Sequence, residues 1–503
     1  MKKKRNVIFF IFTVFLTFSL GMKLIDNFTL KNLNEIKETE LSNHIIEIDS
    51  IYDIVILNGK IIDPESENEY DGWNIGINKD TIAIITQKEL KGKKELNAKN
   101  LIVSSGFIDL LTYDPVEIGA KAKIADGVTS NICMHGGAAK TENWYSHWKK
   151  MKPLVNYGAS FAVNQARMIL GIDIYEQAKG EKLKKLLEMA EKALLEGALG
   201  VSFSLEYSPG CKDEEIYELM LLAKKYDAPT FFHVRYSDME PPGTNIEALE
   251  EVINFARRTK AAVHIDHIHS TGGTFSMKES LQMIKNALAE GLDFTACVYP
   301  YDYWGTHLNT TRFSDSWQKR FRIDYKDLQV AGTNERLTKE TFEKYRKQGK
   351  LVVAYAIPEE ELIMALQTDF VMIGSDAILT ESLNNHPRAC GTYARTIGLY
   401  SREKKVIDLK TALKKCSYLP AKRMEKIAPI FKKLGRIKVG AYADLTIFDF
   451  DKIIDRATPE KTHLYSEGIH YTIISGQIVK EKDSIFDKVR VGKEIRSKHY
   501  SKR

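Results

Sequence analysis

An α/β fold is predicted for this chain of 503 residues: a (β/α)8 TIM-type barrel plus a small composite β-domain built from both chain ends. Three observations lead to this prediction. Short apolar runs alternate with segments of helical periodicity, β-branched runs with turn signals lie near both ends, and one gap between runs is much longer than the others. Parallel strands separated by helices are typical of such a barrel.

The barrel strands are predicted from eight apolar runs. The helices between them are clearest in EKLKKLLEMAEKALLEGALG (181–200), where leucines recur at three and four residues before a glycine. The gap 300–368 is too long for a normal barrel connection, so it is expected to be an insertion that covers a substrate. The predicted strands are 102–110, 128–134, 159–164, 199–204, 229–235, 261–269, 293–299 and 369–376, within a barrel of residues 105–429.

The β-domain is predicted from stretches at opposite ends of the chain. YDIVILNGKIID (52–63) and YTIISGQIVK (471–480) are β-branched runs interrupted by an Asn-Gly or Ser-Gly turn, which is a hairpin signal. GRIKVGAYADLTIFD (435–449) adds a further pair of strands. Residues 51–104 and 430–480 are therefore expected to form one domain, with the barrel inserted between them.

The N-terminal residues 1–21 have the pattern of a secretory signal peptide. Four basic residues, Lys2 to Arg5, precede the apolar run VIFFIFTVFLTFSL (7–20), and the small residues Ser19 and Gly21 fit a cleavage before Met22. The alternative is an uncleaved anchor that attaches the protein to the membrane through residues 6–21. Residues 22–50 are polar and are expected to be a linker. The sequence thus predicts an extracytoplasmic protein, either secreted or anchored at the membrane.

The composition excludes some other classes. Lysine and arginine (73) exceed aspartate and glutamate (67) by only six, and no basic face with interleaved aromatic residues occurs, so nucleic acid is not an expected partner. Part of the excess lies in a basic tail, residues 481–503, which is expected to be a solvated, mobile end. Five scattered cysteines do not form a disulfide framework.

Polar residues with metal-binding chemistry lie at the predicted strand ends. His233 and Arg235 share a face at the end of the fifth strand, and His267 and His269 share one at the end of the sixth. Asp376 ends the eighth strand, and Cys133 and His135 end the second. In barrels the carboxyl ends of the strands meet at one rim. Imidazole, thiolate and carboxylate together are typical zinc ligands, so a metal site is predicted there.

The chain resembles the amidohydrolase superfamily, in particular its D-aminoacylase and N-acyl-D-glutamate deacylase branch. The resemblance covers residues 51 to about 480 and rests on a set of motifs. It implies that His233 and His267 are metal ligands, that Asp376 is the general acid and base, and that Arg388 binds the substrate carboxylate. The motifs are GFID, GVTS, ALGVSFSLEYSPG, FFHVR, HIDHIHSTGG, VYPYDYWGT, GSDAI, NNHPRACGTYAR and ADLTIFD.

One departure from the family pattern affects the metal site. Leu111 and Tyr113 occupy the positions of the H-x-H pair that normally follows GFID, so at most one zinc ion is expected. The family's cysteine ligand after the second strand corresponds to Gly136 here. His135 is favoured as the third ligand because it is nearer the strand end, with Cys133 as the alternative.

Two functions are compatible with these residues. The first is a one-zinc hydrolase that cleaves the amide bond of N-acyl-D-amino acids, with N-acyl-D-glutamate a candidate substrate. Arg388, Arg235 and Arg395 would orient the substrate carboxylate, and Tyr299 would line the pocket. The second is a binding protein that keeps the barrel without turnover, which the loss of the H-x-H pair favours. Asp376 and the paired histidines favour the hydrolase.

Overall fold

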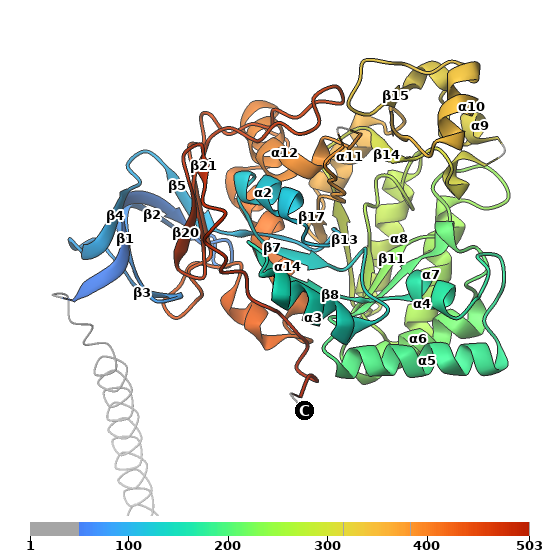
Figure 1. The fold of residues 1–503 in the computed structure, drawn as a ribbon, viewed down its shortest axis with the longest axis horizontal. Helices are drawn as coiled ribbons and strands as arrows, with labels where there is room; N and C mark the ends of the chain where they lie inside the picture. Colours follow the sequence, from blue (N-terminus) through green and yellow to red (C-terminus); the bar gives the residue numbers. More distant parts are fainter. Residues whose placement is uncertain (1–49, 315, 383, 502–503) are drawn as a thin grey trace, which may run out of the picture. The chain divides into compact units, whose positions relative to one another are not determined.

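A computed structural model of the protein describes residues 50–314, 316–382 and 384–501 (Figure 1). The predicted signal peptide or anchor, 1–21, and all but the last residue of the predicted linker, 22–50, lie outside the described residues. Within the described part of the chain, no helix is both long and apolar enough to cross a membrane.

The described residues contain the predicted (β/α)8 barrel. Its strands pair in parallel and in sequence order, and an isolated bridge between Thr112 and Ala377 joins the segments that follow the first and last of them. The strands are β6 (Phe107–Asp109), β7 (Val128–Cys133), β8 (Asn156–Ala159) continued by β9 (Phe161–Ala162), β10 (Val201–Ser204), β11 (Thr230–His233), β12 (Val263–Ile265), β13 (Phe294–Val298) and β17 (Val371–Ile373). The predicted fold class is confirmed, although the first predicted strand, 102–110, is divided between the barrel and the β-domain.

Helices cover the outside of the barrel. In α5 the leucines and alanines repeat at helical spacing, so Leu183, Leu186, Ala190 and Leu194 are buried while the charged side chains face outward. The helices are α2 (Glu117–Ala125), α3 (Thr141–Met151), α4 (Val163–Ile169), α5 (Gly180–Leu195), α6 (Asp213–Lys225), α7 (Asn245–Thr259), α8 (Met277–Ala289), α11 (Glu359–Leu366), α12 (Arg388–Arg395), α13 (Leu409–Leu413) and α14 (Leu419–Met424). The 3₁₀ helices of this part are η1 (Leu205–Tyr207) and η6 (Pro429–Lys433), and the π-helices are η4 (Thr396–Glu403) and η5 (Lys414–Tyr418).

Most of the predicted insertion, 300–368, is a small antiparallel subdomain, drawn in yellow in Figure 1. Its strands β14 (Trp304–His307), β15 (Leu328–Val330) and β16 (Leu351–Ala354) pair in the order β14-β16-β15. An aromatic core holds it together, in which Trp317 stacks on Phe342 with ring centroids 5.3 Å apart. The last part of the range, α11, belongs to the outer layer of the barrel. The remaining elements are η2 (Thr311–Phe313), α9 (Trp317–Phe321), η3 (Tyr325–Asp327) and α10 (Lys339–Lys347).

Strands from both ends of the described chain form one sheet, as the sequence predicts. Its order is β21-β20-β19-β18-β5-β1-β2-β3, with β4 paired to β1. The two parts join where β18 runs antiparallel to β5, and Figure 1 shows the blue and red strands side by side. The strands are β1 (Ile51–Ile62), β2 (Glu69–Asn78), β3 (Thr81–Thr86), β4 (Lys91–Asn97), β5 (Ile102–Ser105), β18 (Leu445–Phe448), β19 (Ile469–Ile474), β20 (Gln477–Glu481) and β21 (Ser484–Ile485).

The basic tail differs from the prediction of a solvated end. Ile495 is only 1% exposed, and the neighbouring Glu494 forms a bridge with Tyr157 of β8. Arg496 lies over the ring of Tyr145, 4.1 Å from its centroid, and pairs with Glu142. The tail packs on the barrel because an isoleucine and the flat face of a guanidinium both cover apolar surface. Its charge count alone did not reveal this.

Candidate active site

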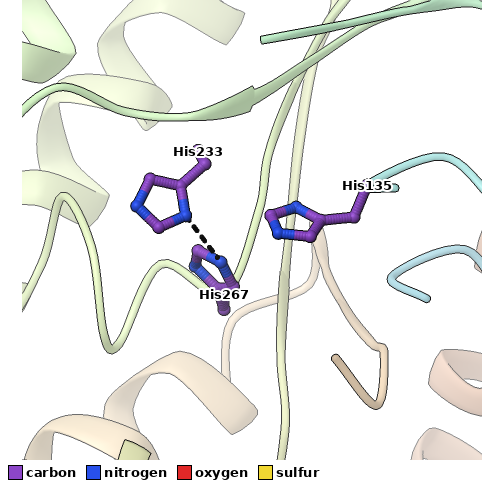
Figure 2. A group of neighbouring side chains, drawn as sticks. All are labelled: His135, His233 and His267. Carbon is purple, nitrogen blue, oxygen red and sulfur yellow. Dashed lines mark hydrogen bonds between the residues drawn. The ribbon is translucent and has the colours of Figure 1, made fainter. Parts of the chain in front are cut away.

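Three histidines meet at the carboxyl end of the barrel (Figure 2). His233 is the last residue of β11, His135 follows β7 by two residues, and His267 follows β12 by two residues. One ring nitrogen from each lies within 4.8 Å of the other two. Nδ1 of His233 is 3.2 Å from Nε2 of His267, and all three side chains are buried. The structure thus brings together the two predicted histidines and the favoured third one.

In each imidazole ring one nitrogen faces the other two histidines (the inner nitrogen), and the other nitrogen (the outer one) contacts a neighbouring side chain. Nε2 of His233 lies 2.8 Å from Glu206 Oε2, and Nδ1 of His267 lies 2.9 Å from Thr271 Oγ1. Nδ1 of His135 lies 2.7 Å from Asp266 Oδ2. With the outer nitrogen donating, the inner nitrogen of each ring presents a lone pair to its neighbours. Metal-binding histidines in proteins are oriented in this way, so the residues present fit a divalent ion such as zinc.

The local electrostatics keep two of the rings neutral. Burial lowers the pKa of His267 well below 6.5, and His233 and His135 lower it further. Burial also lowers the pKa of His233, although Glu206 opposes this effect. At His135 the effect of burial is outweighed by the Asp266 carboxylate, which raises the pKa of the imidazole. Neutral imidazole is the form that binds a metal.

Asp376 lies beside the histidines and is held by Arg388. Its Oδ2 is 2.7 Å from Arg388 Nη2, and Nε of the same arginine donates to the Asp376 backbone oxygen at 2.9 Å. Its Oδ1 has no hydrogen-bond partner among the described residues and lies 3.9 Å from Nε2 of His135. One carboxylate oxygen is therefore fixed and the other faces the histidine cluster. Arg388 also lies over the ring of Tyr299, 4.6 Å from its centroid.

The two residues at the H-x-H positions contribute no imidazole. Leu111 is 1% exposed and packs against Gly374, the residue after the last barrel strand. The contact is so close that a Cβ added to Gly374 would lie only 2.5 Å from the Cβ of Leu111. The ring of Tyr113 lies edge-on to His135, with centroids 5.4 Å apart. Burial, with the charge of Asp376, raises the pKa of the Tyr113 phenol well above 10. Tyr113 is therefore a neutral phenol at neutral pH.

The alternative ligand Cys133 points elsewhere. It packs with Ala138 and Ala159, and burial raises the pKa of its thiol well above 9. Cys133 also lines a cavity of about 280 Å³ together with Tyr113, Gly136 and Ala377. Because Tyr113 contacts His135 and Ala377 follows Asp376, this cavity borders the site.

Three of the predicted substrate-binding residues have other partners. Arg235 forms a two-pronged ion pair with Glu251, at 2.8 and 2.9 Å, and donates to two backbone oxygens, so four of its five donors are occupied. Arg395 pairs with Asp455 at 3.2 Å. The structure thus corrects the prediction that these two arginines are available to a carboxylate. Tyr299 is fully buried, packing against His269 and Arg388.

The face predicted for His267 and His269 is also corrected. β12 ends at Ile265, and His267 has a φ of +28°, so strand alternation no longer applies there. His267 reaches the cluster, whereas His269 packs on Tyr299 with ring centroids 4.1 Å apart.

Sequence reasoning did not find the residues that support the histidines. Glu206 accepts from His233, and it also contacts Arg312 of the insertion at 3.1 Å and Ser237 at 2.6 Å. Burial alone would raise the pKa of Glu206, but Arg312 and His233 hold it at about 2, so it remains a carboxylate. The only sequence signal for Glu206 and Asp266 is a charged residue next to a buried strand, which is weak by itself.

Comparisons with known proteins show which sequences and folds this chain resembles. The N-acyl-D-glutamate deacylase of Alcaligenes xylosoxydans xylosoxydans is 27% identical over 463 residues, covering 84% of this chain and 93% of that protein. The D-aminoacylase of the same organism is 26% identical over 477 residues, covering 86% and 95%. The crystal structure of an N-acyl-D-glutamate deacylase from Bordetella bronchiseptica, in complex with zinc and a phosphonate inhibitor, has a TM-score of 0.77 at 23% identity. It covers 89% of this chain and 100% of that one, and at this identity the likeness shows the fold alone.

The predicted resemblance is confirmed by these relatives and by a family model. The model of the amidohydrolase family matches residues 113–479, which include every residue of the histidine cluster together with Asp376 and Arg388. Because this match extends over more than half of the chain, the protein belongs to the amidohydrolase family.

Proposed function

We propose that this protein hydrolyses the amide bond of N-acyl-D-amino acids, releasing the free amino acid and a carboxylate, with N-acyl-D-glutamate as a candidate substrate. One observation supports this most directly. Three inward-facing imidazoles lie beside a carboxylate oxygen that has no hydrogen-bond partner among the described residues. The names of the relatives give the substrate class.

The three histidines would hold one divalent ion, with zinc as the first candidate. When bound, such an ion polarises a carbonyl group and lowers the pKa of water from 15.7 to about 7. Glu206, Asp266 and Thr271 orient the three rings, since each contacts an outer ring nitrogen. Mutation of residues that orient metal-binding histidines in this way typically lowers metal affinity or activity by about 10- to 100-fold.

Asp376 is proposed as the general base and then the general acid. Its free oxygen, Oδ1, accepts a proton from the attacking water and passes it to the nitrogen of the leaving amine as the C–N bond breaks. Proton transfer by a positioned side chain contributes typically about 100- to 10,000-fold. Arg388 fixes the other oxygen, so the carboxylate cannot rotate away from the histidines.

Arg388 also remains the candidate for substrate binding. Two of its nitrogens already contact Asp376, whereas no partner is observed for Nη1 among the described residues. Nη1 can therefore donate to a substrate carboxylate while the pair with Asp376 persists. The same guanidinium would then position both the base and the substrate.

The test is a stereochemical assay of the zinc-loaded protein. Matched pairs of N-acyl-D- and N-acyl-L-amino acids, with N-acyl-glutamate included, are incubated and the free amino acid is measured. We expect release from the D form only. Absence of hydrolysis for either form by fully metal-loaded protein would reject the proposal.

The binding protein remains a second candidate because Leu111 and Tyr113 replace the H-x-H pair. It predicts a ligand affinity measurable by calorimetry in protein that shows no turnover. Turnover of any N-acyl-amino acid would reject this candidate.

A further inference from the structure

A second group of metal-binding side chains lies inside the barrel. His264 belongs to β12, Asp266 follows that strand, and Cys297 belongs to β13. One donor atom from each lies within 4.8 Å of the other two, and none of the side chains is more than 1% exposed. None of the three belongs to the histidine cluster, although Asp266 contacts His135 through its other oxygen.

Two atoms of this group have no hydrogen-bond partner among the described residues. They are Nε2 of His264 and Oδ1 of Asp266, which lie 3.9 Å apart. The other ring nitrogen of His264 contacts Thr295 Oγ1 at 2.8 Å, so that imidazole is oriented in the same way as the three rings of the cluster. A buried polar group without a partner destabilises the fold, and more so if it is charged. When His264 Nδ1 donates to Thr295 Oγ1, Nε2 presents a lone pair to the Asp266 carboxylate, and a cation between the two groups would stabilise both.

We propose that His264, Asp266 and Cys297 bind a second divalent transition-metal ion, one layer below the histidine cluster. One imidazole, one carboxylate and one thiolate are ligands that suit zinc and its neighbours rather than magnesium or calcium. The two anionic ligands would balance the two charges of the ion. This site does not use the H-x-H positions. It adjoins the histidine cluster, because Asp266 also contacts His135 and the backbone N–H of His267 donates to Cys297 Sγ at 3.3 Å.

The chemistry of binding is a metal-for-proton exchange. A cysteine side chain has an ordinary pKa of about 8.5, so it carries its proton at neutral pH when no ion is bound. Binding forms a sulfur–metal bond and releases the thiol proton to solvent. Tetrahedral zinc with bonds of 2.0–2.3 Å separates its ligand atoms by roughly 3.3–3.8 Å. The observed spread of up to 4.8 Å therefore requires side-chain movements of about 1 Å.

Cobalt provides a test specific to this site. Co²⁺ bound to a thiolate gives a charge-transfer absorption in the near ultraviolet, whereas a three-imidazole site does not. The full chain is produced with cobalt in the growth medium, because a fully buried site is expected to fill during folding. Metal content and absorption are then measured together. We expect a thiolate-to-cobalt band and two ions per chain, one in the histidine cluster and one at this site, in place of the single ion expected from the loss of the H-x-H pair.

Variants assign the band to a residue. Cys297→Ser should remove the band and one ion, while Cys133→Ser, a matched change of a buried cysteine at the end of β7, should retain both. His233→Ala should remove the other ion and leave the band. Hydrolysis is expected to depend on the histidine cluster, so His233→Ala should abolish turnover while the site of His264, Asp266 and Cys297 keeps its ion. This variant therefore tests the second site separately from the proposed function.

Two results would overturn the proposal. Wild-type protein with no thiolate-to-cobalt band would show that Cys297 binds no ion, leaving a water or a direct hydrogen bond between His264 and Asp266. Persistence of the band in Cys297→Ser would assign it to another cysteine. If Cys297→Ser does not fold, His264→Gln should lower the band and the ion count in its place, and an unchanged band there would also reject the site.

Discussion

At the scale of single residues, Asp376 carries the sharpest prediction. Asp376→Asn preserves the size of the side chain and its contact with Arg388, but the amide cannot accept a proton at neutral pH. Turnover of an N-acyl-D-amino acid should fall by about 100-fold or more. Metal content should change little, since the histidines are unchanged.

The matched control for that variant is Asp455→Asn. Asp455 also forms a half-buried pair with an arginine, Arg395, and no contact between this pair and the histidine cluster is observed in the described residues. We expect Asp455→Asn to reduce stability rather than turnover per folded molecule. Equal kinetic losses in both variants would show that Asp376 acts only through the fold.

Arg388→Lys is predicted to change two kinetic constants. A lysine is a single point charge and cannot replace Nε and Nη2, which bind Asp376, while also reaching a substrate. Steady-state kinetics with a carboxylate-bearing substrate should give both a lower kcat and a higher KM. A higher KM with kcat unchanged would restrict Arg388 to substrate binding, and an unchanged KM would place the carboxylate elsewhere.

At the scale of elements, the insertion is tied to the histidine cluster through one buried carboxylate. Glu206 follows β10 and contacts His233 on one side and Arg312 of the insertion on the other. Arg312 also donates to the backbone oxygen of Ser270, which follows His267 by three residues. A change in the insertion can therefore reach two ring positions without touching either histidine.

A pH prediction follows from the same carboxylate. The folded pKa of Glu206 is about 2 against an ordinary value of 4.5. A depressed pKa contributes stability that is present above about pH 4.5 and is lost as the pH falls toward 2, on the order of 3 kcal/mol in all. The free energies of unfolding of wild type and Glu206→Gln, measured with urea, should therefore differ most at neutral pH. The difference should shrink as the pH falls from about 4.5 toward 2. A difference that is constant across this range would remove the charge of Glu206 as the cause.

At the scale of the whole molecule, the C-terminal tail is expected to stabilise the barrel. Ile495→Ala removes a fully buried side chain between the tail and β8, and such changes typically cost about 2–5 kcal/mol. The midpoint of urea unfolding should fall accordingly. Ala substitution of the exposed Lys488 is the control and should lie within about 0.5 kcal/mol of wild type. Equal stability of both variants would restore the solvated tail that the charge count predicts.

The sequence by itself determined the architecture and the main positions of the site. Strand and helix periodicity are local properties, so the barrel and the two-part sheet could be predicted without a structure. Strand ends converge in any such barrel, so His233, His267 and Asp376 could be assigned to one rim. The absence of imidazoles at Leu111 and Tyr113 could also be stated directly from the residues.

Only the tertiary structure decided which groups meet. Strand alternation stops where a strand stops, so the orientation of His135 and His269 depends on turns that a period of two does not describe. Partners such as Glu206 and Arg312, 106 residues apart, are joined by folding and leave no local pattern. Arg235 and Arg395 likewise pair with carboxylates of other elements, which their own sequence neighbourhood does not reveal. Ile495 is buried because the tail packs against β8. Local periodicity thus determines the elements, and long-range packing determines which charges and lone pairs are left free for chemistry.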